Sequence, residues 1–181
     1  MADKESLQSS RSKWLTIARV WDLLALAAIV FAVWKIFIAP RDLNVAKAYP
    51  APHAVYQKLG GGEFRVADQR GKLLFLDFYA SWCDPCKIEA PLVERWAREH
   101  PGAVVVPVDV AEPPIAARNF AKKYGLQNVV LDRQALAQAL FGVVGFPTVV
   151  VIDPQGRIRA KWEGLNPAIE VAMTNAEKTL K

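Results

Sequence analysis

The only two cysteines of the 181-residue chain lie in the run Trp82-Cys83-Asp84-Pro85-Cys86. Two thiols at this spacing can close into a disulfide and reopen, which is redox chemistry. A structural disulfide would instead close a long loop, because its stabilising effect grows with loop length. A zinc site needs four ligands, yet the chain has no second C-x-x-C and only two isolated histidines, His53 and His100. The pattern therefore predicts a redox-active cysteine pair and no metal.

The two cysteines are expected to have different roles. Cys83 lies at the first turn of an expected helix, where unpaired N–H groups and the helix dipole stabilise a thiolate. We therefore expect Cys83 to be the nucleophile that attacks a partner disulfide and forms a mixed disulfide. Cys86, one turn further along, is expected to be better shielded and to resolve that intermediate.

The residues between the cysteines are expected to tune the redox pair. The negative charge of Asp84 disfavours a Cys83 thiolate, which makes the pair more reducing, and Pro85 limits the freedom of the backbone. The alternative is that Asp84 faces solvent, where screening leaves it little influence.

One further acidic residue lies inside an apolar run. Asp77 is the one acidic residue of residues 72–79 (KLLFLDFY), which read as a parallel strand that is covered on both faces. A carboxyl group there should have a raised pKa and could accept the proton of Cys86. The alternative is an aspartate that turns to solvent at the end of the strand.

The elements around these residues alternate between strand and helix. This pattern predicts an α/β fold, with a central mixed sheet flanked by helices. The expected strands cover residues 72–79, 103–110, 126–131, 148–152 and 157–163. The expected helices run from the cysteine motif to about residue 100, over residues 115–124, from Asp132 to residues 141–142, and from residues 166–167 almost to the end.

The N-terminal part is expected to be a separate appendage. Residues 20–39 form an apolar stretch that is long enough to cross a bilayer as one helix. A cleaved signal peptide is the alternative, but Phe37 and Pro40 make a poor cleavage site. We therefore predict a cytoplasmic tail (1–19), a transmembrane signal anchor (20–39), a tether (40–59) and a folded domain (60–181).

The charges around the anchor predict its orientation. Four basic residues precede the span and two follow it closely, which places the N-terminus in the cytoplasm. The cysteine domain of a bacterial inner-membrane protein would then face the periplasm or the cell exterior. The net charge of +5 forms no basic stripe with interleaved aromatics, so the sequence does not support binding to nucleic acid.

Four motifs occur in an order that resembles the thioredoxin superfamily, above all its membrane-tethered TlpA/ResA-like branch. They are the strand carrying Asp77, the motif at residues 82–86, the run from Cys86 to Pro91, and Gly145-Phe146-Pro147-Thr148. The resemblance implies a thioredoxin-like fold from about residue 60 onwards. It also implies a cis bond before Pro147, which would bring the Phe146 backbone beside the disulfide to pair with a substrate.

The resemblance also implies roles for two further residues. Glu89 matches an acidic residue that modulates the thiols in this branch, and Trp82 would shield one side of the sulfurs and contact substrate. The implied activity is thiol–disulfide exchange without a cofactor. We expect a reductase of protein disulfides, with the haem-site cysteines of apocytochrome c as leading candidates and a membrane dithiol protein of the DsbD or CcdA kind as electron donor.

Three alternatives stay open at this stage. The first is an oxidase or isomerase that donates its disulfide, although the strongest oxidants of the superfamily have a histidine between the cysteines. The second is a copper chaperone that uses Cys83 and Cys86 as soft ligands, although no histidine follows His100 to act as a third ligand. A thiol peroxidase is weaker, since the chain has no isolated cysteine in a Thr-x-x-Cys setting.

Overall fold

The computed structural model describes residues 19–33 and 48–181 of the chain, which divides into a unit up to Ala39 and a unit from Pro40. Residues 19–33 form a helix, and its large apolar side chains are exposed. No helix within the described residues is both long and apolar enough to span a bilayer. The rest of the predicted anchor and most of the predicted cytoplasmic tail lie outside the described residues.

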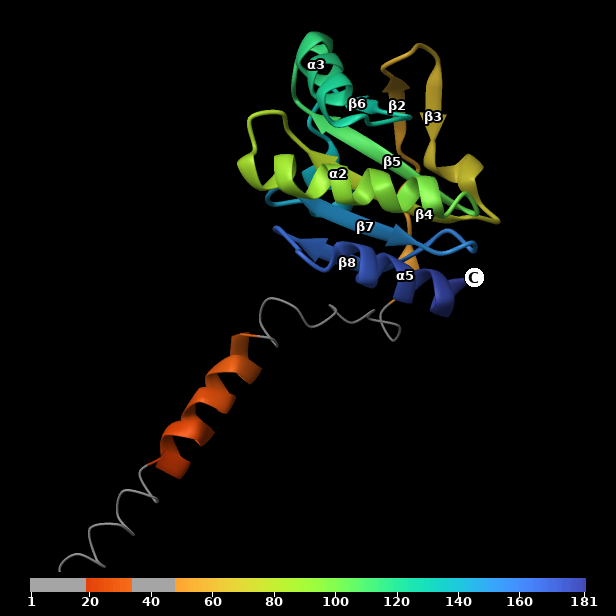
Figure 1. Ribbon diagram of the computed structural model, residues 1–181. Coiled ribbons are helices and arrows are strands. Elements are labelled where there is room, and N and C mark those ends of the chain that lie inside the picture. Colours follow the sequence, from red (N-terminus) through yellow and green to blue (C-terminus); the bar gives the residue numbers. More distant parts are fainter. Residues whose placement is uncertain (1–18, 34–47) are drawn as a thin grey trace, which may run out of the picture. The chain divides into compact units, whose positions relative to one another are not determined.

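One mixed sheet of eight strands forms the centre of the second unit, in the order β1-β8-β7-β4-β5-β6-β2-β3 (Figure 1). The central strand β4 (Leu73–Tyr79) is parallel to β5 (Ala103–Val110) and antiparallel to β7 (Thr148–Ile152). Every residue of β4 is buried, as its continuous apolar run predicts. The other strands are β1 (Tyr49–Pro50), β2 (Val55–Lys58), β3 (Glu63–Arg65), β6 (Val130–Asp132) and β8 (Arg157–Glu163).

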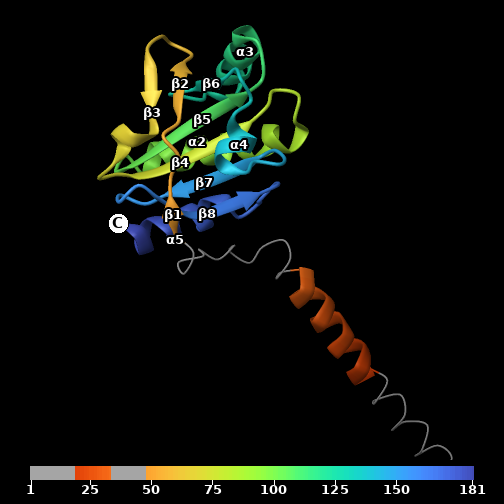
Figure 2. The same ribbon diagram turned by 180° about the vertical axis from the view of Figure 1, so that it is seen from behind.

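Helices cover both faces of this sheet, as the sequence predicts. The helices α2 (Asp84–Glu99), α3 (Pro114–Tyr124) and α5 (Ile169–Leu180) lie on one face (Figure 1). The short helix α4 (Ala137–Phe141) lies on the opposite face (Figure 2). A 3-10 turn, η3 (Val66–Gln69), connects β3 to β4. This is the predicted thioredoxin-like α/β architecture.

Alternate residues of β4 pack into different layers, because successive side chains of a strand point to opposite faces. Leu73 and Phe75 pack among residues of α2 and α5, whereas Leu76 and Phe78 pack on the α4 side. Asp77 lies two residues after Phe75 on β4, so its side chain points to the same face of the sheet. Its carboxyl group therefore points into the layer that holds α2 and not to solvent.

The folded domain begins earlier than the sequence predicts. The strands β1 and β2 lie within residues 40–59, whose prolines predict a tether. Pro50 is tolerated because β1 is the edge strand, paired with β8 alone, so its missing N–H leaves no ladder bond unmade. Tyr56 on β2 is buried in the core below α4. Residues 49–58 therefore belong to the domain.

The interior position of β5 is a second difference. Pro107 predicts an edge strand or a bulge, yet β5 lies between β4 and β6. The ladder to β6 involves only Val108 to Val110, so no residue of β6 lies opposite Pro107. The proline is accommodated because it precedes the part of β5 that is paired on both sides.

Candidate active site

The cysteine motif lies where β4 ends and α2 begins, at the end of the sheet. Cys83 is the N-cap of α2, and its sulfur accepts a hydrogen bond from the backbone N–H of Cys86 at 3.2 Å. Pro85 occupies the first turn of the helix, where its missing N–H costs no hydrogen bond. The helix N-terminus therefore directs its free N–H groups and its positive dipole end at the Cys83 sulfur.

Cys83 and Cys86 are joined as a disulfide, with their Cα atoms 5.3 Å apart. Cys83 keeps 5% of its surface exposed and Cys86 only 1%. The more accessible sulfur at the helix end suits attack on an external disulfide, and the buried one suits the resolving step. Geometry and burial are thus consistent with the roles that the sequence predicts for the two residues.

Two aromatic residues lie beside the motif. The Phe146–Pro147 peptide bond is cis, and Phe146 packs against the cluster that contains both cysteines. The ring of Trp82 meets the ring of Phe146 edge-on, with the ring centroids 6.0 Å apart. Trp82 remains 68% exposed. The two rings therefore present an accessible apolar surface next to the disulfide, where a protein substrate could dock.

Asp77 and Glu89 are two carboxyl groups buried behind the motif. Asp77 is only 3% exposed, and one of its oxygens has no hydrogen-bond partner among the described residues. Burial and then the charge of Glu89 raise the pKa of Asp77 well above its usual range. Glu89 accepts a hydrogen bond at 2.7 Å from the backbone N–H of Asn166, in the loop before α5. Burial and the charge of Glu89 therefore both favour the protonated form of Asp77 over the carboxylate.

Asp84 does not face the sulfurs. Its side chain is 87% exposed and lies 2.6 Å from the ammonium group of Lys87. The hydrogen bond to Lys87, together with its positive charge, lowers the pKa of Asp84. The structure thus matches the solvent-facing alternative, and any repulsion of a Cys83 thiolate by Asp84 is offset by Lys87.

Three further residues near the motif are not predicted from the sequence. Glu112, in the turn after β5, accepts hydrogen bonds from the backbone N–H and the hydroxyl group of Ser81. Asp109, near the end of β5, is 1% exposed. Asp109 interrupts an apolar strand just as Asp77 does, and that signal could have identified it. Nothing in the local sequence distinguishes Ser81 or Glu112.

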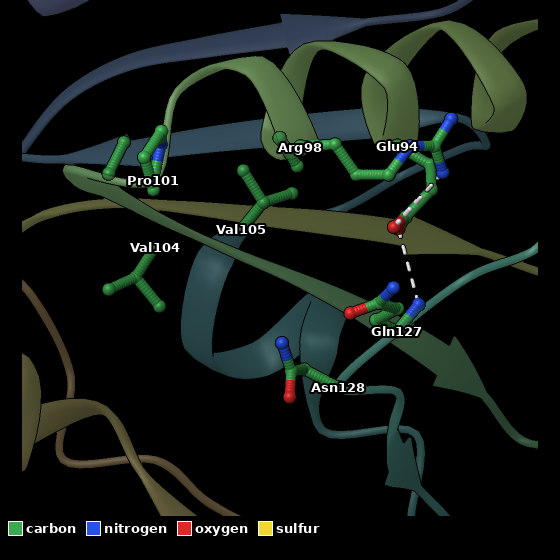
Figure 3. Close-up of a pocket in the computed structure, with 9 residues that line it drawn as sticks. Glu94, Arg98, Pro101, Val104, Val105, Gln127 and Asn128 are labelled. Carbon is green, nitrogen blue, oxygen red and sulfur yellow. Dashed lines mark hydrogen bonds and ion pairs between the residues drawn. The ribbon is translucent and has the colours of Figure 1, made fainter.

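A surface hollow lies at the far end of α2, away from the disulfide (Figure 3). Glu94 accepts a hydrogen bond there from the backbone N–H of Gln127 and forms an ion pair with Arg98. These contacts tie α2 to the loop after α3 and contribute no group to the cysteine site. Across residues 19–33 and 48–181, no group of three or more His, Cys, Asp and Glu side chains is placed to bind a metal ion.

Comparisons with known proteins agree with this geometry. The sequence profile of the AhpC/TSA family matches residues 48–161. Thiol-disulfide oxidoreductase ResA of Geobacillus thermodenitrificans is 34% identical over 140 residues, which cover 76% of this chain and 80% of the relative. ResA of Bacillus subtilis is 30% identical over 139 residues, covering 75% and 77%. The structure of MTB dsbF superposes with a TM-score of 0.65 at 27% identity and covers 72% of this chain and 99% of that one.

Proposed function

The chain belongs to the AhpC/TSA family and is a thiol–disulfide oxidoreductase with a thioredoxin-like fold, and we propose that it is a membrane-anchored reductase of protein disulfides. The observation that carries this proposal is the position of Glu89. This buried carboxyl group lies one helical turn beyond Cys86, and its charge adds to burial in raising the pKa of Asp77. A buried negative charge destabilises thiolates nearby, and a less stable reduced form is a stronger reductant.

The proposed reaction balances within the cysteine pair. The Cys83 thiolate attacks one sulfur of the substrate disulfide, which releases the other substrate sulfur as a thiolate and forms a mixed disulfide. The ionised form of Asp77 takes the proton of Cys86, whose thiolate attacks the sulfur of Cys83 and releases the second substrate sulfur as a thiolate. The enzyme ends with the Cys83–Cys86 disulfide that the structure contains. A membrane dithiol protein of the DsbD or CcdA kind would supply the two electrons that restore the dithiol.

Membrane anchoring is part of the proposal. Apolar residues cover every face of the helix at residues 19–33, and the apolar sequence continues to Ala39. The basic residues before it favour a cysteine domain in the periplasm or outside the cell. The substrates would then be disulfides of proteins in that compartment, with the haem-site cysteines of apocytochrome c as our leading candidate.

Alkylation in intact bacterial cells tests together whether the protein is anchored in the membrane and whether it acts as a reductase. A maleimide that cannot cross the inner membrane should label Cys83 and Cys86 in the full chain, and alkaline carbonate should leave the protein in the membrane. After rapid acid quenching, most of the protein should be in the dithiol form when the membrane donor is present. A protein that stays oxidised in cells containing the donor would refute the reductase proposal, and one that carbonate extracts would refute the anchor.

The substrate proposal needs its own comparison. A peptide with an internal C-x-x-C-H disulfide should oxidise the reduced enzyme faster than the same peptide with the two cysteines far apart. Equal rates for the two peptides would remove the preference for haem-site cysteines while leaving the reductase activity intact.

A further inference from the structure

Glu112 reaches from the turn after β5 to the turn between β4 and α2. One of its carboxylate oxygens accepts a hydrogen bond from the backbone N–H of Ser81 at 2.5 Å, and the other accepts one from the Ser81 hydroxyl group at 2.7 Å. A carboxylate that binds both the backbone and the side chain of one residue fixes the orientation of that residue as well as its position.

Ser81 belongs to the tight turn that leads directly into the nucleophile. The backbone N–H of Cys83 donates a hydrogen bond to the carbonyl oxygen of Ala80 at 3.1 Å, which closes the turn around Ser81 and Trp82. Helix α2 starts at the next residue, Asp84. A contact that holds Ser81 therefore also holds the approach to Cys83 and the base of the Trp82 side chain.

Asp109 supports Glu112 from the interior. Both oxygens of Asp109 are buried, and no N–H or O–H group of the described residues donates to them. Burial and then the charge of the Glu112 carboxylate raise the pKa of Asp109 and so favour its neutral form. A neutral Asp109 does not repel the Glu112 carboxylate.

The backbone between these two acids has an unusual conformation. Ala111 has a φ of 60°, in the left-handed region that residues with a Cβ atom rarely adopt. Its N–H donates to the carbonyl oxygen of Asp132 at 3.0 Å, which holds the turn in place. The turn directs Glu112 back towards Ser81 although Glu112 lies beyond the end of β5.

We propose that Glu112 is a positioning residue for thiol–disulfide exchange, and that its carboxylate, bound to the backbone and the hydroxyl group of Ser81, holds Cys83 and Trp82 for attack. The inference rests on exchange chemistry at Cys83 and not on whether the enzyme reduces or oxidises its substrates. It predicts that loosening the Ser81 turn slows attack by Cys83 without unfolding the domain.

The buried Asp109 makes the contact between Glu112 and Ser81 sensitive to pH. Burial and then the charge of Glu112 raise the pKa of Asp109 to about 8. The residues opposite Asp109 are Tyr79 on β4 and Leu131 on β6. The pKa of Tyr79 is itself raised by burial, Asp109, Asp77 and Glu112, so its phenol stays neutral as Asp109 titrates. Above the pKa of Asp109, the two carboxylates would repel each other, and the contact between Glu112 and Ser81 should loosen.

The test measures the second-order rate constant for attack of the reduced full chain, in detergent, on glutathione disulfide. Near neutral pH, Glu112→Ala should lower this rate constant about 10- to 100-fold, which is the effect expected when a reacting group is misplaced. Ser81→Ala keeps the hydrogen bond from the backbone N–H to Glu112 and loses the one from the hydroxyl group. It should lower the rate constant about threefold to fivefold, the effect of losing one hydrogen bond. Glu99→Gln, at an exposed site at the end of α2, is the matched control and should be unchanged.

The substitution Asp109→Asn separates positioning from general stability. It keeps a neutral side chain of similar shape beside Glu112, so its rate constant should stay within about twofold of the parent near neutral pH. Above a pH of about 8, the parent should slow relative to Asp109→Asn. A parent-like rate in Ser81→Ala would overturn the proposal, as would an identical pH profile for Asp109→Asn and the parent. Because these variants retain the Glu112 side chain, they test the proposal even if Glu112→Ala does not fold.

Discussion

Asp77 on β4 and Glu89 on α2 are buried in the same layer behind the disulfide, and the charge of Glu89 adds to burial in raising the pKa of Asp77. The two acids have different partners. Glu89 accepts a hydrogen bond from Asn166, whereas one oxygen of Asp77 has none among the described residues. Burial therefore favours the protonated form of Asp77 and strengthens Asp77 as a base once it is ionised.

The first prediction concerns proton transfer. Asp77→Asn removes the group that we expect to accept the Cys86 proton, and general bases contribute about 10²- to 10⁴-fold to such steps. Oxidation of the dithiol by a protein disulfide should therefore slow by at least about tenfold near neutral pH. Stopped-flow mixing would measure the rate of the resolving step. A resolving step as fast as in the parent would eliminate Asp77 as the proton acceptor.

The same variant makes a prediction about stability. The folded-state pKa of Asp77 is raised, so the native state holds a proton that the unfolded state loses above a pH of about 4. The contribution of Asp77 to stability is therefore complete below that pH and decreases as pH rises towards the folded-state pKa. Asp77→Asn should be more stable than the parent near neutral pH, and the gain should shrink on acidification. Thermal unfolding of the oxidised protein across this range measures it.

A control at an exposed aspartate makes the stability result interpretable. Asp68→Asn, on η3, removes a charge from the surface and should leave the difference from the parent nearly independent of pH. If the stability difference between Asp77→Asn and the parent is also independent of pH, the ionisation of Asp77 does not destabilise the folded protein.

Trapping of a reaction intermediate tests the two cysteine roles. Cys86→Ser leaves Cys83 able to attack but removes the resolving thiol, so a stable mixed disulfide with the substrate should accumulate. Cys83→Ser exposes only the Cys86 thiol, which is 1% accessible, and should accumulate far less. Non-reducing electrophoresis followed by mass spectrometry measures both. Equal trapping by the two variants would show that attack is not restricted to Cys83.

Trp82 should matter for large substrates and not for small ones. Trp82→Ala removes an exposed ring beside the disulfide, and loss of an aromatic anchor at a protein interface typically costs tenfold or more, so kcat/KM for a protein disulfide should fall about tenfold. The rate with glutathione disulfide should change by less than about twofold, because that substrate is too small to cover the ring. Tyr49→Ala is the aromatic control, since β1 pairs at the other end of β8. An equal loss with both substrates would mean that Trp82 acts on the thiols themselves.

Hydrophobic patterning predicts the core elements well because their boundaries are chemically sharp. The strands at residues 103–110, 148–152 and 157–163 begin and end where the sequence predicts. The short strand β1 contains Pro50, and β2 follows Pro52 closely. Apolar and polar residues do not alternate regularly in either strand, so the local sequence resembles a tether. Only their pairing with β8 and β6, across long stretches of chain, makes them part of the sheet.

The site is predicted where residue type and position are both distinctive. Asp77 is recognisable because a charge in a buried strand is costly, and the motif at residues 82–86 stands out by its spacing. Glu112 cannot be recognised in this way, since an acidic residue in a loop is ordinary. It acquires meaning only because the parallel pairing of β4 and β5 brings their following turns together at one end of the sheet.

The reduction potential of the Cys83–Cys86 pair is the most direct test of the reductase account. The full chain in detergent would be equilibrated with dithiothreitol or glutathione buffers, and the dithiol fraction would be quantified after acid quenching and alkylation. The account predicts a value near that of thioredoxin, about −270 mV, because a buried carboxylate destabilises the reduced form. A value near the strongly oxidising end, about −120 mV, would contradict it and identify a donor of disulfides.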